Sequence, residues 1–260
     1  MKNATRAISE ACCEQATGRH ESGSCPLIIV ADAHAGVKNG LEPEFLAMLK
    51  TLENSTADVV FLGDIFDLWI AFPRYEQELH REFMEWCRIQ KERRNVYFVE
   101  GNHEFFVNRR RRSVFTAYDD SRDGLLIGNF LFVHGDRVNF NDKNYLRFRN
   151  VVKSGVARFF VRFMPCGPRI VHYVKEGMKK TNHNFRKFIP KAEIMAFAEK
   201  AKSLNAKIVF MGHFHHGEII ETDGITVCMV PDWYKTRQVA RFDPALKQIA
   251  FLPWQEAASR

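Results

Sequence analysis

The run Ile208-Val209-Phe210-Met211-Gly212-His213-Phe214-His215-His216 carries the strongest structural signal in this chain. Its leading apolar residues, two of them β-branched, predict a buried strand over residues 208–211 that stops at Gly212. Side chains alternate along an extended chain, so His213 and His215 can point to the same side. Two imidazoles on one side of a loop at a strand end are suitable metal ligands, although surface or capping histidines would give the same short pattern.

Four other apolar segments lead into polar side chains in the same way. They are predicted as strands over residues 26–31, 57–62, 95–100 and 129–133, with helices over 44–52 and 75–88 between them. The residues that follow these strands are Asp32-Ala33-His34, Gly63-Asp64, Gly101-Asn102-His103-Glu104 and His134-Gly135-Asp136. Polar residues directly after buried strands indicate a site at one edge of a sheet. Coincidence seldom repeats such a pattern, and the sequence therefore predicts a metal site.

The donors in these segments are carboxylates, an amide and imidazoles, without a thiolate. This mixture suits Mn²⁺, Fe or Zn²⁺ in a reactive site better than a structural zinc. The donors are too many for one ion, whereas two ions that share one carboxylate would use them all. Such a pair lowers the pKa of a bridging water and holds the attacking and leaving oxygens of a displacement at phosphorus. The sequence therefore favours a phosphoester hydrolase.

The composition predicts a basic, globular protein. Hydrophobic residues make up 46% of the 260 residues, which is enough for a sizeable core. A net charge of +7 favours an anionic partner, such as a phosphorylated small molecule, an acidic membrane surface or nucleic acid. The 6 cysteines lack C-x-x-C spacing, and no secretory segment is evident, so we expect reduced thiols in the cytoplasm. No apolar run is long enough to span a membrane.

The chain is predicted to form one domain over residues 26–260, preceded by a flexible extension over 1–25. Within the domain, residues 143–191 contain 13 Lys or Arg and a single acid, Glu176. Helical spacing over residues 152–163 predicts a basic amphipathic helix, followed after Pro165 by a second helical stretch over 170–178. This helical pair could be a lid, a membrane-surface element or an ordinary hairpin whose apolar side is core.

Two further features lie outside these motifs. The run Arg109 to Arg112 is either a solvated face or an aid to anion attraction. After His216, segments 218–221, 225–230, 238–242 and 248–252 are predicted as an antiparallel meander that completes a second sheet. We therefore expect an α/β fold, a four-layer α/β/β/α sandwich of two mixed sheets with a helical insertion.

Together these motifs resemble the calcineurin-like metallophosphoesterase superfamily over about residues 27–253. Within it, the chain is similar to the UDP-2,3-diacylglucosamine hydrolase family of lipid A synthesis. The closer similarity rests on residues after His134-Gly135-Asp136, in the basic insertion and near the end of the chain: Asp142, Tyr145, Phe148, Arg149, Pro165, Asn184, Lys187 and Trp233. The resemblance implies that the insertion over 143–191 is a lid that shelters acyl chains.

The resemblance also implies a ligand set. The first metal ion would be held by Asp32, His34, Asp64 and His215, and the second by Asp64, Asn102, His134 and His213. Catalysis would use Asn102, Asp64 and His103, and His103 would protonate the leaving oxygen or stabilise the transition state. Implied substrate contacts are Asn102, His103, Asp142, Asn184, Lys187 and His213. Supporting positions are Asp67 (alternatively a helix N-cap), Glu104, which would orient His103, and Asp136.

The implied activity is hydrolysis of the pyrophosphate of UDP-2,3-diacylglucosamine, or of a similar nucleotide-linked lipid, to a lipid sugar phosphate and UMP. We expect two divalent ions, Mn²⁺ before Fe or Zn²⁺, and a location in the cytoplasm, on the inner face of the membrane. The alternatives are a soluble phosphodiesterase, phosphatase or nuclease of the same superfamily, and a non-catalytic scaffold. The chain lacks a basic face interleaved with aromatic residues, so we expect no nucleic-acid partner. The family commonly has arginine at His103, and arginine and serine at Gly177 and Lys180.

Overall fold

The computed structural model describes residues 25–36, 39–165, 167 and 189–258. The predicted N-terminal extension, apart from Cys25, lies outside the described residues. The second helical stretch of the insertion lies outside them too, with Gly177, Lys180, Asn184 and Lys187. In the described part of the chain, no helix is both long and apolar enough to span a bilayer.

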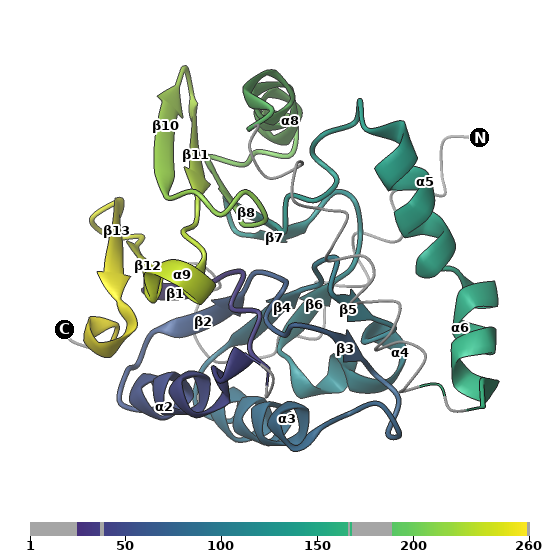
Figure 1. The fold of residues 1–260 in the computed structure, drawn as a ribbon. Helices are drawn as coiled ribbons and strands as arrows, with labels where there is room; N and C mark the ends of the chain where they lie inside the picture. The colour runs from purple at the N-terminus through teal and green to yellow at the C-terminus, as the bar shows by residue number, and fades with distance from the viewer. Residues whose placement is uncertain (1–24, 37–38, 166, 168–188, 259–260) are drawn as a thin grey trace.

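A six-stranded mixed sheet forms one half of the sandwich (Figure 1). Its strand order is β13-β12-β1-β2-β4-β6, in which β1, β2, β4 and β6 run parallel and β12 and β13 lie antiparallel at one edge. The strands are β1 (Leu27–Val30), β2 (Asp58–Phe61), β4 (Val96–Val99), β6 (Ala117–Asp119), β12 (Gln238–Asp243) and β13 (Gln248–Pro253). The three strands β1, β2 and β4 are buried on both faces, which explains their continuous apolar runs.

A five-stranded mixed sheet forms the other half, in the order β10-β11-β9-β8-β7. Its central strands β11, β9 and β8 are parallel, and the edge strands β10 and β7 are antiparallel. The strands are β7 (Leu125–Ile127), β8 (Phe130–Val133), β9 (Ile208–Met211), β10 (Glu218–Thr222) and β11 (Ile225–Met229). A separate two-stranded ribbon joins β3 (Trp69–Ile70) to β5 (Glu104–Phe105).

Because side chains alternate along each strand, the two faces of the first sheet pack against different layers of the structure. In β1, Ile28 and Val30 pack with α2 (Glu42–Leu52) and α3 (Glu78–Lys91) on the outer face. Leu27 and Ile29 pack instead against the second sheet, with Phe132 and Phe210. The outer face of the second sheet is covered by α8 (Lys191–Lys202) (Figure 1). The predicted α/β/β/α sandwich of two mixed sheets is therefore confirmed.

The prediction that four terminal strands form one meander in the second sheet is wrong. Strands β10 and β11 belong to the second sheet, whereas β12 pairs with β1 in the first. Between them the chain crosses from one sheet to the other through α9 (Trp233–Thr236), and then reverses at Arg237, whose φ is 57°. Alternation identified the strands but not their partners, because a strand's neighbour is chosen by long-range packing.

Two helices of the insertion lie to one side of both sheets (Figure 1). They are α5 (Lys143–Val152) and α6 (Gly155–Phe163), and Ser154 caps α6 by accepting a 3.1 Å hydrogen bond from the Ala157 N–H. The sequence predicted one helix over residues 152–163, but the Ser154 cap divides the segment.

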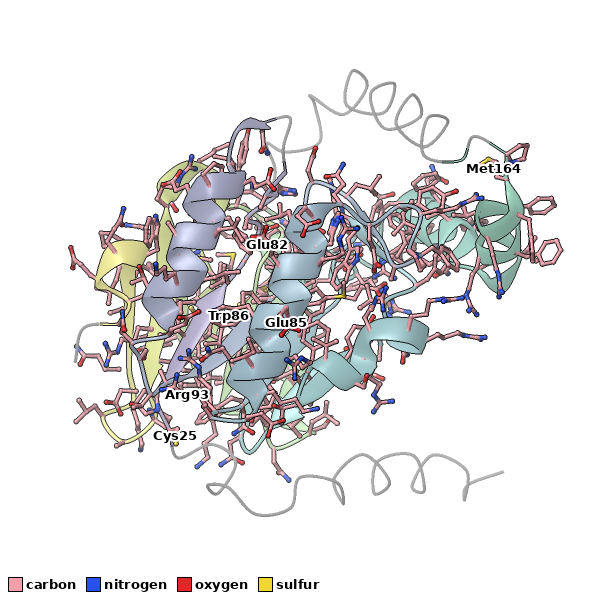
Figure 2. The ribbon with its side chains drawn as sticks, turned by 90° about the horizontal axis from the view of Figure 1, so that it is seen from below. Cys25, Glu82, Glu85, Trp86, Arg93 and Met164 are labelled. Carbon is pink, nitrogen blue, oxygen red and sulfur yellow. The ribbon has the colours of Figure 1, made fainter. Side chains whose placement is uncertain are left out.

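In Figure 2, Met164 marks the outer end of α6, while Trp86 of α3 lies beside α2. The short helix α4 (Asn108–Arg111) holds most of the arginine run.

Candidate metal centre

The loops after five strands meet at one end of the sandwich. Strands β1, β2 and β4 are parallel in the first sheet, and β8 and β9 are parallel in the second, so their carboxyl ends lie together. A hydrogen bond of 2.7 Å from the His213 N–H to Asp32 Oδ2 joins the two sheets there. The described residues form three groups whose donor atoms all lie within 4.8 Å of one another: Asp32, His34 and His215; His34, Asp64 and His103; Asp64, His134 and His213.

Asp64 lies at the centre of these groups. Its Oδ2 is 3.9 Å from His34 Nε2 and 3.7 Å from His103 Nε2, and its Oδ1 is 3.5 Å from His134 Nε2. Burial raises the pKa of Asp64, but the surrounding imidazoles, above all His103 and His134, outweigh it and hold the pKa well below its usual range. The carboxylate is therefore ionised and faces both sides of the cluster, as a shared ligand must.

Five of the predicted ligand residues have a left-handed backbone conformation, which residues other than glycine rarely adopt. The φ angles are 49° at Asp32, 43° at His34, 51° at Asp64, 68° at His213 and 52° at His215. Such conformations cost free energy and persist only where the surrounding structure enforces them. Their concentration at the strand ends is an independent sign that these loops are shaped for a site.

Two glycines leave room for the carboxylates. A Cβ at Gly101 would lie 2.3 Å from Asp64 Oδ1, and one at Gly212 would lie 2.7 Å from Asp32 Oδ2. Any side chain at either position would displace the carboxylate next to it. The glycines that precede Asn102 and His213 in the sequence are therefore there for close approach.

The donor set fits a pair of divalent cations. Asp32 is fully buried, and its Oδ1 has no hydrogen-bond partner among the described residues, as expected of a ligand atom. His134 Nδ1 donates to the Leu62 carbonyl at 3.0 Å, so its Nε2 faces Asn102 Oδ1 at 3.2 Å. Oxygen and nitrogen donors around these atoms are suitable ligands for divalent ions.

The imidazoles of this cluster respond differently to their surroundings. Burial lowers the pKa of His134, but Asp64 outweighs it and raises the pKa to about 10. Burial together with the charge of His134 lowers the pKa of His213 to about 4. Burial also lowers the pKa of His215, yet Asp232 and Asp32 raise it to about 9. Protons on His134 and His215 therefore supply the positive charge that the carboxylates require, and bound cations would replace them.

His103 stands at the open side of the cluster, with 27% of its side chain exposed. Its Nδ1 donates to the backbone carbonyl of Asp67 at 2.7 Å, which fixes the ring and turns Nε2 toward Asp64. Asp67 was predicted as a supporting residue or a helix N-cap, and the contact it makes with His103 is through its main chain. The ring is therefore held in place and remains partly open to solvent.

Glu104 and Asp136 contact groups other than the ligand side chains. Glu104 was predicted to orient His103, but its carboxylate accepts hydrogen bonds from the backbone N–H groups of Asp64, Ile65 and Gly101, at 2.8 to 2.9 Å. Burial and the nearby Asp64 charge raise the pKa of Glu104 to about 8, although these donors favour its ionised form. Glu104 therefore holds the loop that carries Asp64.

Asp136 connects the site to the insertion. It accepts hydrogen bonds from Tyr145 Oη, at 2.9 Å, and from Arg149 Nε, both on α5. Burial raises the pKa of Asp136, but Arg149 and His134 outweigh this and hold it at about 2. Asp142, a predicted substrate contact, caps α5 by accepting from the Tyr145 N–H at 2.9 Å.

Sequence reasoning missed two residues near the site. Lys153, directly after α5, donates to Glu100 Oε1 at 2.7 Å and to the Gly101 carbonyl, which precedes Asn102. Asp232 lies 3.4 Å from His215 Nδ1 through its Oδ2. Asp232 follows the apolar strand 225–230, so the rule that found the other ligands could also have found it. No comparable signal marks Lys153, because its partner lies far away in the sequence.

Carboxylates and imidazoles at one end of such a sandwich are the arrangement of a metal-dependent phosphoester hydrolase. Comparison with known families supports this class independently of the geometry. A model described as calcineurin-like phosphoesterase matches residues 25–217, and the chain belongs to that family.

Curated relatives carry a more specific name. The UDP-2,3-diacylglucosamine hydrolase of Neisseria gonorrhoeae is 27% identical over 224 residues, covering 80% of this chain and 90% of the relative. The protein of the same name from Shewanella piezotolerans is 26% identical over 215 residues, with the same coverage of 80% and 90%. Among solved structures, an archaeal phosphodiesterase aligns with a TM-score of 0.47 at 14% identity, covering 87% of this chain and 98% of that chain.

Proposed function

We propose that this hydrolase cleaves the pyrophosphate of UDP-2,3-diacylglucosamine, or of a similar nucleotide-linked lipid, to UMP and a lipid sugar phosphate. The observation that carries the proposal is a cluster of donors for two metal ions beside a basic helical insertion whose apolar side chains are exposed. A substrate with phosphates at one end and acyl chains at the other suits both parts. The curated relatives of that name, at 26–27% identity, point to the same substrate class.

The ligands we assign are the first and third groups in the structure, with Asn102 added and Asp64 shared between the ions. One ion would be held by Asp32, His34, Asp64 and His215, and the other by Asp64, Asn102, His134 and His213. Two divalent ions, Mn²⁺ before Fe or Zn²⁺, would activate water and stabilise charge on the phosphoryl oxygens.

The remaining chemistry belongs to side chains at the open edge of the cluster. His103 would donate a proton from Nε2 to the leaving oxygen or stabilise the charge that develops on it, since Asp67 already accepts from its Nδ1. Asn102 and His213, which both lie against His134, would contact the substrate phosphates. We assign further substrate contacts to Asp142, directly before the insertion, and to Asn184 and Lys187 within it, and propose that residues 143–191 act as a lid.

The substrate assignment predicts product release that can be measured directly. Purified protein with Mn²⁺ and UDP-2,3-diacylglucosamine should release UMP, because the cluster would bind the pyrophosphate while the lid binds the acyl chains. The assay compares UMP release with cleavage of bis-p-nitrophenyl phosphate, which needs only the metal centre. Cleavage of the nitrophenyl diester without any release of UMP would instead identify a general soluble phosphodiesterase.

The exposed face of α6 supports binding to a membrane surface. Val156, Phe159, Phe160 and Phe163 are 61 to 68% exposed, although apolar side chains of this size normally lie inside. Slight burial and the charges of Arg109, Arg110 and Arg162 lower the pKa of Arg158, so arginines of α4 and α6 lie close together. An exposed apolar helix face bordered by arginines matches an anionic lipid surface. We therefore propose a peripheral location on the inner face of the cytoplasmic membrane.

The same surface gives a second prediction. Replacing both Phe159 and Phe163 with serine should weaken binding to phosphatidylglycerol vesicles about 10²-fold or more, since each buried Phe contributes roughly 1.5–3 kcal/mol. Co-sedimentation with vesicles measures the effect. The control is Leu246→Ser, which removes an equally exposed apolar side chain, 71% accessible, from the β12–β13 turn. Equal binding by all three proteins would contradict a membrane role for α6.

A further inference from the structure

His215 lies between two carboxylates that come from different sheets. Its Nε2 is 3.4 Å from Asp32 Oδ1, at the end of β1, and its Nδ1 is 3.4 Å from Asp232 Oδ2, after β11. Asp232 is only 2% exposed. Asp232 Oδ2 and His215 Nδ1 are both buried, and neither has a hydrogen-bond partner among the described residues. A buried carboxylate oxygen and a buried ring nitrogen thus have only each other to satisfy.

We propose that Asp232 is a positioning residue that orients the His215 ring toward one metal ion, an inference that rests on the proposed metal centre. An imidazole whose Nδ1–H points at a carboxylate keeps the tautomer with a free lone pair on Nε2. That lone pair faces Asp32 and therefore the first ion. The carboxylate also makes the imidazole a stronger ligand.

Asp232 is itself fixed against the strand that carries Asp32. The Asp232 backbone forms a parallel β-bridge with Ala31. The next two N–H groups, of Trp233 and Tyr234, donate to the Ala31 and Asp32 carbonyls at 3.0 and 3.1 Å. The Thr236 hydroxyl donates to the Asp232 carbonyl at 2.7 Å. The crossing between the sheets therefore sets the position of the carboxylate relative to Asp32. His215, whose left-handed backbone lies in a loop, has no regular secondary structure to hold its ring.

The role is specific to one of the two proposed ions. The Nδ1 atoms of His134 and His103 donate to neutral carbonyls, those of Leu62 and Asp67. His215 instead faces a charged group. Loss of Asp232 should therefore lower the affinity for the ion held by Asp32, His34 and His215. The affinity for the ion held by Asn102, His134 and His213 should stay nearly unchanged.

The experiment measures metal binding and needs no substrate. Protein freed of metal with a chelator is titrated with Mn²⁺ in a calorimeter. Asp232→Ala should weaken one of the two binding events by about 10–100-fold, the scale found for carboxylates that support a metal-bound histidine. Asp232→Asn keeps the shape and an acceptor oxygen but loses the charge, so its effect should be smaller. Proton spectra of the zinc-loaded protein, labelled with ¹⁵N at histidine, should lose the protected His215 Nδ1–H signal in Asp232→Ala.

Thr236→Val is the matched control, because it removes a hydrogen bond to the Asp232 main chain and spares the carboxylate. It should retain both binding events and the protected ring signal. Unchanged Mn²⁺ affinity in Asp232→Ala would overturn the proposal. It would also be overturned if Asp232→Ala and Thr236→Val weakened both Mn²⁺ binding events to the same extent. If the unmodified protein bound no Mn²⁺, the metal centre itself would be wrong, and Asp232 could have no such role.

Discussion

Replacement of Asp64 by alanine is expected to abolish hydrolysis and to weaken the binding of both metal ions. Asp64 is 2% exposed and belongs to two of the three donor groups, and its two oxygens face different imidazoles. Without its charge, His34, His103 and His134 lose their shared partner. We expect kcat/KM to fall by at least about 10³-fold, since loss of a single electrostatic stabiliser already costs about 10²–10³. Steady-state kinetics and metal analysis of the purified variant measure the two effects.

Asp58→Asn is the control for this change. Asp58 is also a buried carboxylate, 5% exposed, but it lies at the opposite end of β2 and accepts hydrogen bonds from Asn95. Its replacement should lower stability while metal content and turnover persist. Substantial turnover in Asp64→Ala, or equal loss of metal in both variants, would show that Asp64 is not the shared ligand.

Replacement of His103 by alanine is expected to separate metal binding from turnover. The His103 side chain is 27% exposed, more than those of His34 at 10%, His134 at 1% and His215 at 13%. Its role at the leaving oxygen predicts that both ions remain bound while kcat falls by about 10²–10⁴-fold. Metal analysis and single-turnover kinetics measure these two quantities.

The choice of substrate distinguishes the two roles considered for His103. If it donates a proton, the loss should be smaller with a nitrophenyl diester, whose leaving group needs no proton, than with an alkyl diester. If it only stabilises charge, the two losses should be similar. His216→Ala is the control, since this neighbouring imidazole is 52% exposed and pairs with Glu218 at 3.3 Å. Wild-type turnover in His103→Ala, or loss of metal from it, would refute the assignment.

The sequence predicted the features that are encoded locally. A buried strand followed by a ligand is visible within about eight residues, and parallel strands bring such ends to one edge of a sheet. The layers could be predicted for the same reason, because alternation determines which side chains face each layer. The destination of β12 could not be predicted, since its pairing with β1 joins residues some 200 positions apart along the chain. The ribbon of β3 and β5 has two residues in each strand, too few to show a period.

The functions of the supporting side chains were harder to predict than the candidate ligands. Glu104 lies next to His103 in the sequence, yet its carboxylate holds the loop of Asp64. Asp67 contacts His103 through its main chain, which no pattern of side chains can reveal. Asp232 follows an apolar strand as the candidate ligands do, but its contact with His215 arises only where the chain after β11 reaches Ala31 of the other sheet. Such contacts depend on three-dimensional approach between segments and leave little trace in local sequence.

The left-handed ligand residues also bear on how this enzyme can evolve. Each such residue raises the conformational free energy of the folded state by about 1–3 kcal/mol. The total for all of them is comparable with the net stability of an ordinary domain. Apolar packing within the sandwich has to compensate for that cost. A mutation that loosens a strand far from the catalytic end would thus reduce the reserve that keeps these loops in place. Selection for hydrolysis is therefore also selection for a tightly packed interior.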